Sequence, residues 1–315
     1  MTDCRTTSSL FDNLARVLAQ RAPRSAHAMM GARWSFAWPV DAPSEFSIPA
    51  DYVAAVARRS GLRVVQHAGA ESIDGHLDAG ESVVLAVDAF HLEHRPAFGR
   101  VHAARTVLVR AGRNAREVWL DDWWQPAYLG PIDRTALERA RRSQVPYDPR
   151  LEPVYSGTPI DGEWFSMAID SIQLADVSAW AAAILCELIV GGKQGLVALR
   201  ALYNDVCGTP TPTLARSASL VLRAELSTRV FLCAWLRAAA RWLEAPTLLE
   251  VAARYYDALE AMETSRDLLA KCVAHPRPAY QSILLARLGV AIAVEEQLAS
   301  SLEPISERNT PCGSI

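Results

Sequence analysis

Hydrophobic and polar positions follow different patterns in the two halves of the chain. In the first half, four short runs are apolar and rich in β-branched residues, with turn residues between them, which predicts strands. These runs are residues 62–67, 82–90, 105–111 and 117–124. From residue 164 the chain is rich in alanine and leucine with a helical period, which predicts helices. The predicted fold class is α+β in the first half, followed by an all-α second half.

The first half also contains predicted helices. The apolar residues of segment 7–22 recur at helical spacing, and a helix is predicted there, ending near Pro23. Further helices are predicted at 49–59 and at 134–143, where Asp133 is the expected N-cap. A separate aromatic run holds three side chains that alternate along the chain, which predicts one face of a strand. They are Trp34, Phe36 and Trp38.

Glycine and proline divide the second half into five predicted helices. These cover residues 165–190, 193–206, 212–242, 246–273 and 276–302. Arginine and glutamate residues within these apolar stretches predict either buried ion pairs between helices or a polar pocket, and the sequence does not separate the two. The predicted organisation is a papain-like first domain at 1–145, a linker at 146–163, a helical domain at 164–303 and a disordered tail at 304–315.

Charge and cysteine usage narrow the class of protein. The 315 residues carry a net charge of −3 without a run of lysine or arginine, so nucleic acid is not an expected partner. The six cysteines are scattered and form no CxxC pair, which favours reduced thiols over disulfides or a zinc site. No signal-peptide pattern is present, and the longest apolar run contains Glu187 and is too short to span a bilayer. We therefore expect a cytoplasmic protein that does not bind membranes.

Cys4 lies at or just before the start of the first predicted helix. The unpaired N–H groups and the dipole at a helix start lower the pKa of a thiol and favour the nucleophilic thiolate. The alternative is that Cys4 is a small apolar residue near the terminus.

A second set of polar residues accompanies the predicted strands 82–90, 105–111 and 117–124. His102 precedes one strand, and Asp121 and Asp122 lie on the next. A helix-start thiol, a histidine at a strand start and a carboxylate one hairpin later are the parts of a papain-like Cys–His–Asp site. His91 and His94 flank a strand end with Asp88, where a metal site is one interpretation and polar residues at a cleft rim are the other. The rim is favoured, because no ligand spacing closes a tetrahedron.

The first domain resembles the N-terminal domain of the butirosin biosynthesis protein H family. The resemblance covers about residues 3–150 and is carried by short segments that include the strands just described. They are CRTT at 4–7, MGARWSF at 30–36, VDAFHL at 87–92, RPAF at 95–98, HAARTVLV at 102–109, VWLDD at 118–122 and PAYLG at 126–130. That family is in turn similar to the papain-like peptidases that process bacteriocin leaders.

The resemblance implies an acyltransferase of natural-product biosynthesis, often associated with nonribosomal peptide machinery. The nucleophile would take an acyl group from the phosphopantetheine arm of a carrier protein and pass it to an amine acceptor. No cofactor or metal of its own is implied. Cys4 carries over as the nucleophile and Asp122 as the orienting carboxylate, with Asp121 as runner-up because adjacent strand residues point to opposite faces. A homo-oligomer is compatible with this picture.

One position departs from the family pattern. Family members have two histidines three residues apart, and here the second is Arg105, which stays protonated and cannot act as a base. Three alternatives follow: His102 serves as the base, Arg105 holds a Cys4 thiolate, or the site is inactive and only binds. A thioesterase or amidase using the same thiol is a further alternative. The residues expected to line the site are Arg105, Asp121, Trp34 and His91.

Overall fold

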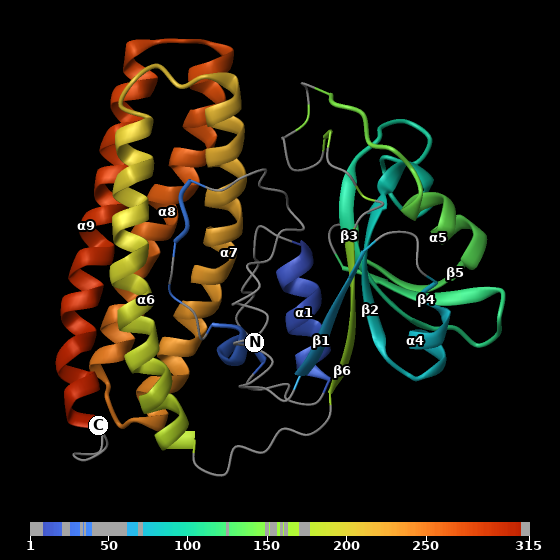
Figure 1. The fold of residues 1–315 in the computed structure, drawn as a ribbon, viewed down its shortest axis with the longest axis horizontal. Coiled ribbons are helices and arrows are strands. Elements are labelled where there is room, and N and C mark those ends of the chain that lie inside the picture. The colour runs from blue at the N-terminus through green and yellow to red at the C-terminus, as the bar shows by residue number, and fades with distance from the viewer. Residues whose placement is uncertain are drawn as a thin grey trace. The chain divides into compact units, whose positions relative to one another are not determined.

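The computed structural model describes most of the chain as two compact units (Figure 1). The described residues are 9–20, 26–31, 34, 36–39, 62–68, 72–123, 126–148, 151, 156–157, 160, 163–169 and 177–309. The sheet unit is drawn from Ser8–Pro23 and Ser44–Ile172, and the helical unit includes Arg24–Pro43 and Gln173–Ile315. The predicted class, α+β followed by all-α, is confirmed, although Arg24–Pro43 belongs to the helical unit.

Among the described residues, six antiparallel strands form one sheet in the order β1-β6-β2-β3-β4-β5. Their bounds are β1 Leu62–Ala68, β2 Ser82–Asp88, β3 Ala104–Ala111, β4 Glu117–Asp122, β5 Tyr128–Asp133 and β6 Glu163–Ile169. The predicted strand at 82–90 ends at Asp88, where a 3-10 turn, η1 (Ala89–His91), begins. Because β2 runs opposite to β3, the end of β2 lies beside the start of β3, and Asp88 is paired with Ala104.

Helices cover both faces of this sheet (Figure 1). On one face, α4 (Asp74–Asp78) and α5 (Arg134–Arg141) pack on a core that includes Leu85 and Val107. On the other face lies α1 (Ser9–Ala19), whose Asn13 Nδ2 donates to Thr106 Oγ1 over 3.2 Å. The alternation of strand side chains explains this division, because Thr106 and Val107 point to opposite faces.

The helix that the sequence predicts from residue 165 does not begin there, so this prediction is wrong for segment 165–169. The segment belongs to β6, which pairs with β1 on one side and β2 on the other. Both faces of an inner strand are covered, so β6 is nearly continuous in apolar residues and lacks a clear alternating pattern. The predicted boundary between linker and helical domain at 163–164 therefore coincides with a strand of the sheet.

Other differences concern local elements. The described residues of the alternating run from Trp34 to Trp38 are not in a strand and pack within the helical unit instead. The sequence did not predict β5, a short edge strand that contains Pro131. Proline is tolerated at a sheet edge because its missing N–H costs no ladder bond there. The predicted helix at 49–59 lies outside the described residues.

Within the described part of the helical unit there are four long helices and one short helix. They are α2 Ala26–Met30, α6 Val177–Asp205, α7 Pro212–Trp242, α8 Thr247–Ala274 and α9 Pro278–Asn309. The last three confirm the predicted helices closely at their starts, but α9 continues past the predicted end at 302. Leu302 and Ile305 are buried in the core, which favours the helix there despite Pro304. The predicted tail is thus helical as far as Asn309.

The predicted break at Gly191-Gly192 is also wrong, since α6 passes through it without interruption. A Cβ built on Gly192 would overlap the ring of Trp34. Glycine at this position therefore allows the indole to pack directly on the helix backbone. Among the described residues α6 alone is long and apolar enough to cross a membrane, a property it shares with buried core helices.

Replacing Gly192 with alanine should destabilise the protein by about 1–3 kcal/mol, because the added methyl group overlaps the buried Trp34 ring. Urea unfolding followed by circular dichroism measures the change. Gly289→Ala on α9 is the matched control, since a Cβ there meets no atom within 4 Å. In a helix interior that control should be neutral or stabilising by up to about 1 kcal/mol. Equal effects of the two substitutions would contradict the packing argument.

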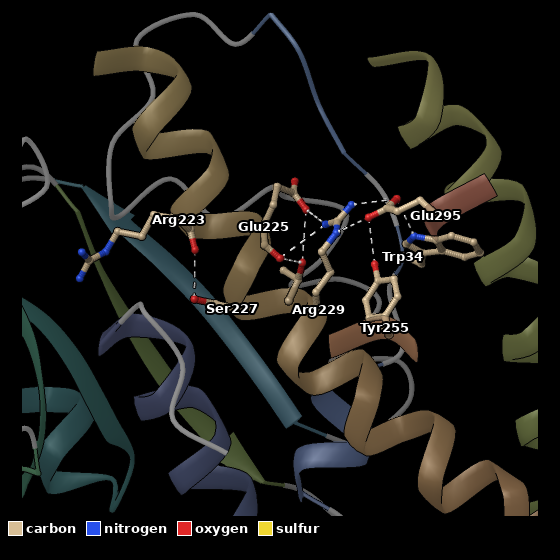
Figure 2. A network of polar contacts seen from close by, with 8 residues as sticks. Trp34, Arg223, Glu225, Ser227, Arg229, Tyr255 and Glu295 are labelled. Carbon is tan, nitrogen blue, oxygen red and sulfur yellow. Dashed lines mark hydrogen bonds and ion pairs between the residues drawn. The ribbon is translucent and has the colours of Figure 1, made fainter. Parts of the chain in front are cut away.

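A buried polar network joins three helices and the Trp34 segment (Figure 2). Arg229 of α7 has no exposed surface and bonds Glu225 over 2.5 Å and Glu295 of α9 over 2.7 Å. Tyr255 of α8 donates to Glu295 Oε1 over 3.0 Å, and Trp34 Nε1 donates to Glu295 Oε2 over 3.0 Å. The prediction of buried arginine–glutamate pairs between helices is confirmed for this set.

Candidate functional site

Polar side chains converge at one end of the sheet, where β2 ends and β3 begins. His102 Nδ1 lies 2.6 Å from Asp88 Oδ2. The Asp88 side chain is fully buried, whereas 36% of the His102 side chain is exposed. The Phe90 ring stacks on the imidazole at 4.2 Å between centroids and 7° between planes. A buried carboxylate therefore holds one edge of a histidine whose ring is still reachable from solvent.

The surroundings of Asp88 determine its charge. Burial raises the pKa of this carboxyl, but hydrogen bonds from Ser143, His102, Phe90 N and Ala103 N outweigh it and lower the pKa overall. The ionised carboxylate can only accept hydrogen bonds, so Nδ1 of His102 must carry the proton that it donates. In the neutral imidazole Nε2 then keeps its lone pair. Within the part of the chain that the structure describes, Nε2 has no hydrogen-bond partner.

Two more side chains extend this arrangement. Ser143, which follows α5, donates from Oγ to Asp88 Oδ2 over 2.7 Å. His91, at the end of η1, places Nε2 3.3 Å from the same Ser143 Oγ. His91 is expected from the sequence to line the site, and its ring centroid is 6.4 Å from that of His102. Sequence reasoning missed Ser143 as a site residue, and it considered Asp88 only as part of a metal site with His91 and His94.

Asp122 is expected from the sequence to orient His102, but the structure pairs it with other groups. Its Oδ1 accepts a short hydrogen bond from Arg105 Nη2, and its Oδ2 lies 2.9 Å from His94 Nε2. Arg105 is largely buried and permanently charged, so it needs a nearby carboxylate, and Asp122 lies on the adjacent strand. The partner of His102 is instead Asp88, which the strand register places beside the start of β3.

Asp121 points to the opposite face from Asp122, as the strand argument predicts. Its Oδ2 lies 2.9 Å from Arg16 of α1 and 3.8 Å from Arg110. Burial lowers the pKa of Arg110, and the charge of Asp121 opposes that effect. Asp121 is thus an ion-pair partner between α1 and the sheet, on the face away from Asp122.

The direction of α1 follows from its contacts. Asn13 bonds Thr106, and one helical turn later Arg16 bonds Asp121, which is paired with Leu108. The helix therefore runs parallel to β3, and its N-terminal end points to the sheet end that carries Asp88 and His102. Cys4, five residues before the start of α1, lies outside the described residues. Trp34, also expected to line the site, is buried in the core of the helical unit.

A cavity of about 430 Å³ adjoins His91 on the α5 side of the sheet. Its apolar wall is formed by Leu92, Tyr128, Pro131, Ile132 and Ala136, and its polar lining by His91, Glu93, His94 and Asp133. The His94 ring stacks on Tyr128 at 4.3 Å. Among the described residues no cluster of three or more histidine, cysteine or carboxylate side chains could hold a metal ion.

The arrangement can orient an imidazole and accept a proton at Nε2, which is the function of the base in acyl-transfer sites. The sequence does contain a signal for Asp88, which is the single charged residue at the end of an apolar, buried strand. A charged residue in such a position is rarely buried without a partner. No family model matches this chain, and no curated protein matches it either. The relationship to the butirosin biosynthesis protein H family therefore stays a prediction from the quoted segments.

Proposed function

We propose that the protein is a cysteine-dependent acyltransferase of natural-product biosynthesis. It would move an acyl group from a carrier-protein thioester to an amine acceptor, in the cytoplasm. Cys4 is the proposed nucleophile, His102 the base and Asp88 the orienting carboxylate. The observation that carries the proposal is the 2.6 Å contact between His102 Nδ1 and the buried Asp88, while Nε2 has no hydrogen-bond partner among the described residues.

The proposed reaction has two half-reactions. His102 Nε2 takes the proton of the Cys4 thiol, and the thiolate attacks the thioester carbonyl carbon. A bond forms between that carbon and Cys4 Sγ, the carrier's thiolate leaves, and His102 returns the proton to it. The amine then attacks the acyl-cysteine, loses a proton to His102 and displaces Cys4, which is reprotonated.

Arg105 does not have to hold a Cys4 thiolate in this scheme. Its charge is balanced by Asp122, and a separate carboxylate holds His102. Of the three alternatives given for this position, the geometry favours the one in which His102 is the base. The choice of Cys4 as the nucleophile rests on the resemblance of CRTT at 4–7 to the butirosin biosynthesis protein H family.

Mixing the protein with an acyl-loaded carrier protein and measuring intact mass tests the proposal. We expect one acyl group on wild-type protein, located on Cys4 by peptide mapping, and none on Cys4→Ala. Addition of an amine should discharge the adduct as an amide. Cys312→Ala is the matched control at a cysteine near the other end of the chain, and it should be acylated like the wild type.

Two other outcomes would replace the proposal. Discharge of the adduct to the free acid at the same rate with and without amine would indicate a thioesterase or amidase. Carrier binding of equal affinity in wild type and Cys4→Ala, without any adduct, would indicate a binding protein that has lost catalysis.

A further inference from the structure

We infer that Ser143 and His91 are positioning residues for His102 and act through Asp88. The inference rests on the proposed function for its catalytic meaning, but the hydrogen bonds that carry it are independent of any reaction. It adds two residues that the Cys–His–Asp pattern does not contain.

The directions of the hydrogen bonds follow from the number of protons available. Ser143 has one hydroxyl proton and donates it to Asp88 Oδ2 over 2.7 Å. The hydroxyl oxygen can therefore only accept from His91, so His91 Nε2 must be protonated when it bonds Ser143 over 3.3 Å. The chain of donors then reads His91 to Ser143 to Asp88, and Asp88 accepts from His102 on its other side.

This series of hydrogen bonds fixes the orientation of the Asp88 carboxylate. Oδ2 accepts from His102 and Ser143, and Oδ1 accepts from the backbone N–H groups of Phe90 and Ala103 at 3.0 Å each. Four donors from three separate chain segments fix both the plane and the charge of the carboxylate. Hydrogen bonds to a charged acceptor are stronger than those between neutral groups. Removal of one of the four should therefore change the pKa of Asp88 and weaken its hold on His102. Ser143 is the only one of the four that a side-chain substitution removes without touching η1 or His102.

His91 connects this series of hydrogen bonds to the adjoining cavity, which it also lines. His91 Nε2 contacts Ser143 Oγ, and its ring centroid lies 6.4 Å from that of His102. The other polar residues that line the cavity are Glu93, His94 and Asp133. The hydroxyl proton of Ser143 goes to Asp88 rather than to the Gln144 carbonyl, because the carboxylate is charged and lies 2.7 Å from Oγ, against 3.5 Å for the carbonyl oxygen. His91 donates to the remaining side of the same oxygen.

The protein contains an internal control for this arrangement. At the other end of β2, His67 Nε2 lies 2.9 Å from Ser166 Oγ, and Glu81 interacts with Ser166 and with His76 Nδ1 at 2.8 Å. Here a histidine, a serine, a carboxylate and a second histidine follow in the same order. Ser166→Ala therefore removes a chemically equivalent hydroxyl without touching Asp88.

The experiment compares Ser143→Ala and Ser143→Thr by NMR and by the rate of Cys4 acylation. Carboxyl ¹³C shifts follow the ionisation of Asp88, and ring ¹⁵N shifts report which nitrogen of His102 is protonated. Ser143→Ala should raise the pKa of Asp88, because its largest favourable hydrogen bond is lost, and slow acylation about tenfold. Ser143→Thr keeps the hydroxyl, so its Asp88 pKa and its acylation rate should be close to those of the wild type. Ser166→Ala should change neither the pKa of Asp88 nor the acylation rate.

His91 is tested in the same way with His91→Phe and His91→Gln. The phenylalanine variant lacks the donor and should raise the pKa of Asp88 in the same direction as Ser143→Ala, by a smaller amount. The glutamine variant keeps an N–H donor and should behave like the wild type.

An unchanged Asp88 titration and an unchanged His102 tautomer in Ser143→Ala would overturn the inference, and wild-type behaviour of His91→Phe would remove His91 from it. The NMR measurements do not need turnover. If no variant, including the wild type, is acylated, the proposed function fails while the titrations still decide whether Ser143 and His91 position His102.

Discussion

Arg229→Met is expected to destabilise the protein by about 3–5 kcal/mol, because it leaves two buried glutamates without their cation. Arg229 has no exposed surface and contacts Glu225 and Glu295 (Figure 2). Burial alone would lower the pKa of Arg229, but the charges of Glu295 and Glu225 raise it well above its usual value. Burial raises the pKa of Tyr255, because it disfavours the charged phenolate. The hydroxyl therefore keeps its proton and donates it to Glu295.

Urea unfolding of wild type and variant measures this difference. The matched control is Arg200→Met, because Arg200 pairs with Glu296, the residue next to Glu295, but the side chains are 58% and 43% exposed. An exposed pair of this kind contributes about 0–1 kcal/mol, so the control should be nearly neutral. A similar loss of unfolding free energy in both variants would show that burial does not determine how much the Arg229 network contributes to stability.

A double substitution refines the result. Arg229→Met combined with Glu295→Gln removes one of the two uncompensated charges, and it should recover part of the lost stability. Because Trp34 Nε1 donates to Glu295 Oε2, a glutamine that keeps a carbonyl oxygen can still hold the indole. A double variant less stable than the sum of the single ones would contradict the charge argument.

Asp88→Asn is the second substitution with a large expected effect, on activity. An asparagine amide can donate to His102 Nδ1, which would move the imidazole proton to Nε2 and block it as a base. We expect Cys4 acylation to slow by about a thousandfold to ten-thousandfold, as loss of the orienting carboxylate does in other triads. Single-turnover acylation, followed by mass, provides the rate.

The control is Asp122→Asn, which tests the partner expected from the sequence. Asp122 contacts Arg105 and His94, so the substitution should cost stability through the unpaired arginine while leaving the His102–Asp88 pair intact. Acylation per folded molecule should then remain within about tenfold of the wild type. A larger loss in Asp122→Asn than in Asp88→Asn would restore Asp122 as the orienting carboxylate and contradict the pairing described above.

Local pattern was sufficient for most elements and insufficient for those that depend on distant partners. The runs that form β1 to β4 and the helices α5, α7 and α8 carry their period and their end signals within themselves. By contrast, β6 is a strand because β1 and β2 flank it, and α6 continues through Gly191-Gly192 because Trp34 packs there. Neither partner is near in the sequence, so propensity alone predicted the wrong element.

The class of fold, the amphipathic first helix and the opposite faces of Asp121 and Asp122 follow from the order of residues alone, as does the set of polar residues from which a site could form. Which of these residues meet depends on tertiary contacts. Antiparallel pairing of β2 with β3 brings Asp88 beside His102, and pairing of β3 with β4 gives Arg105 the carboxylate of Asp122. A buried charge is stable only with a partner within a few ångströms, and strand register, which no single segment encodes, chooses that partner.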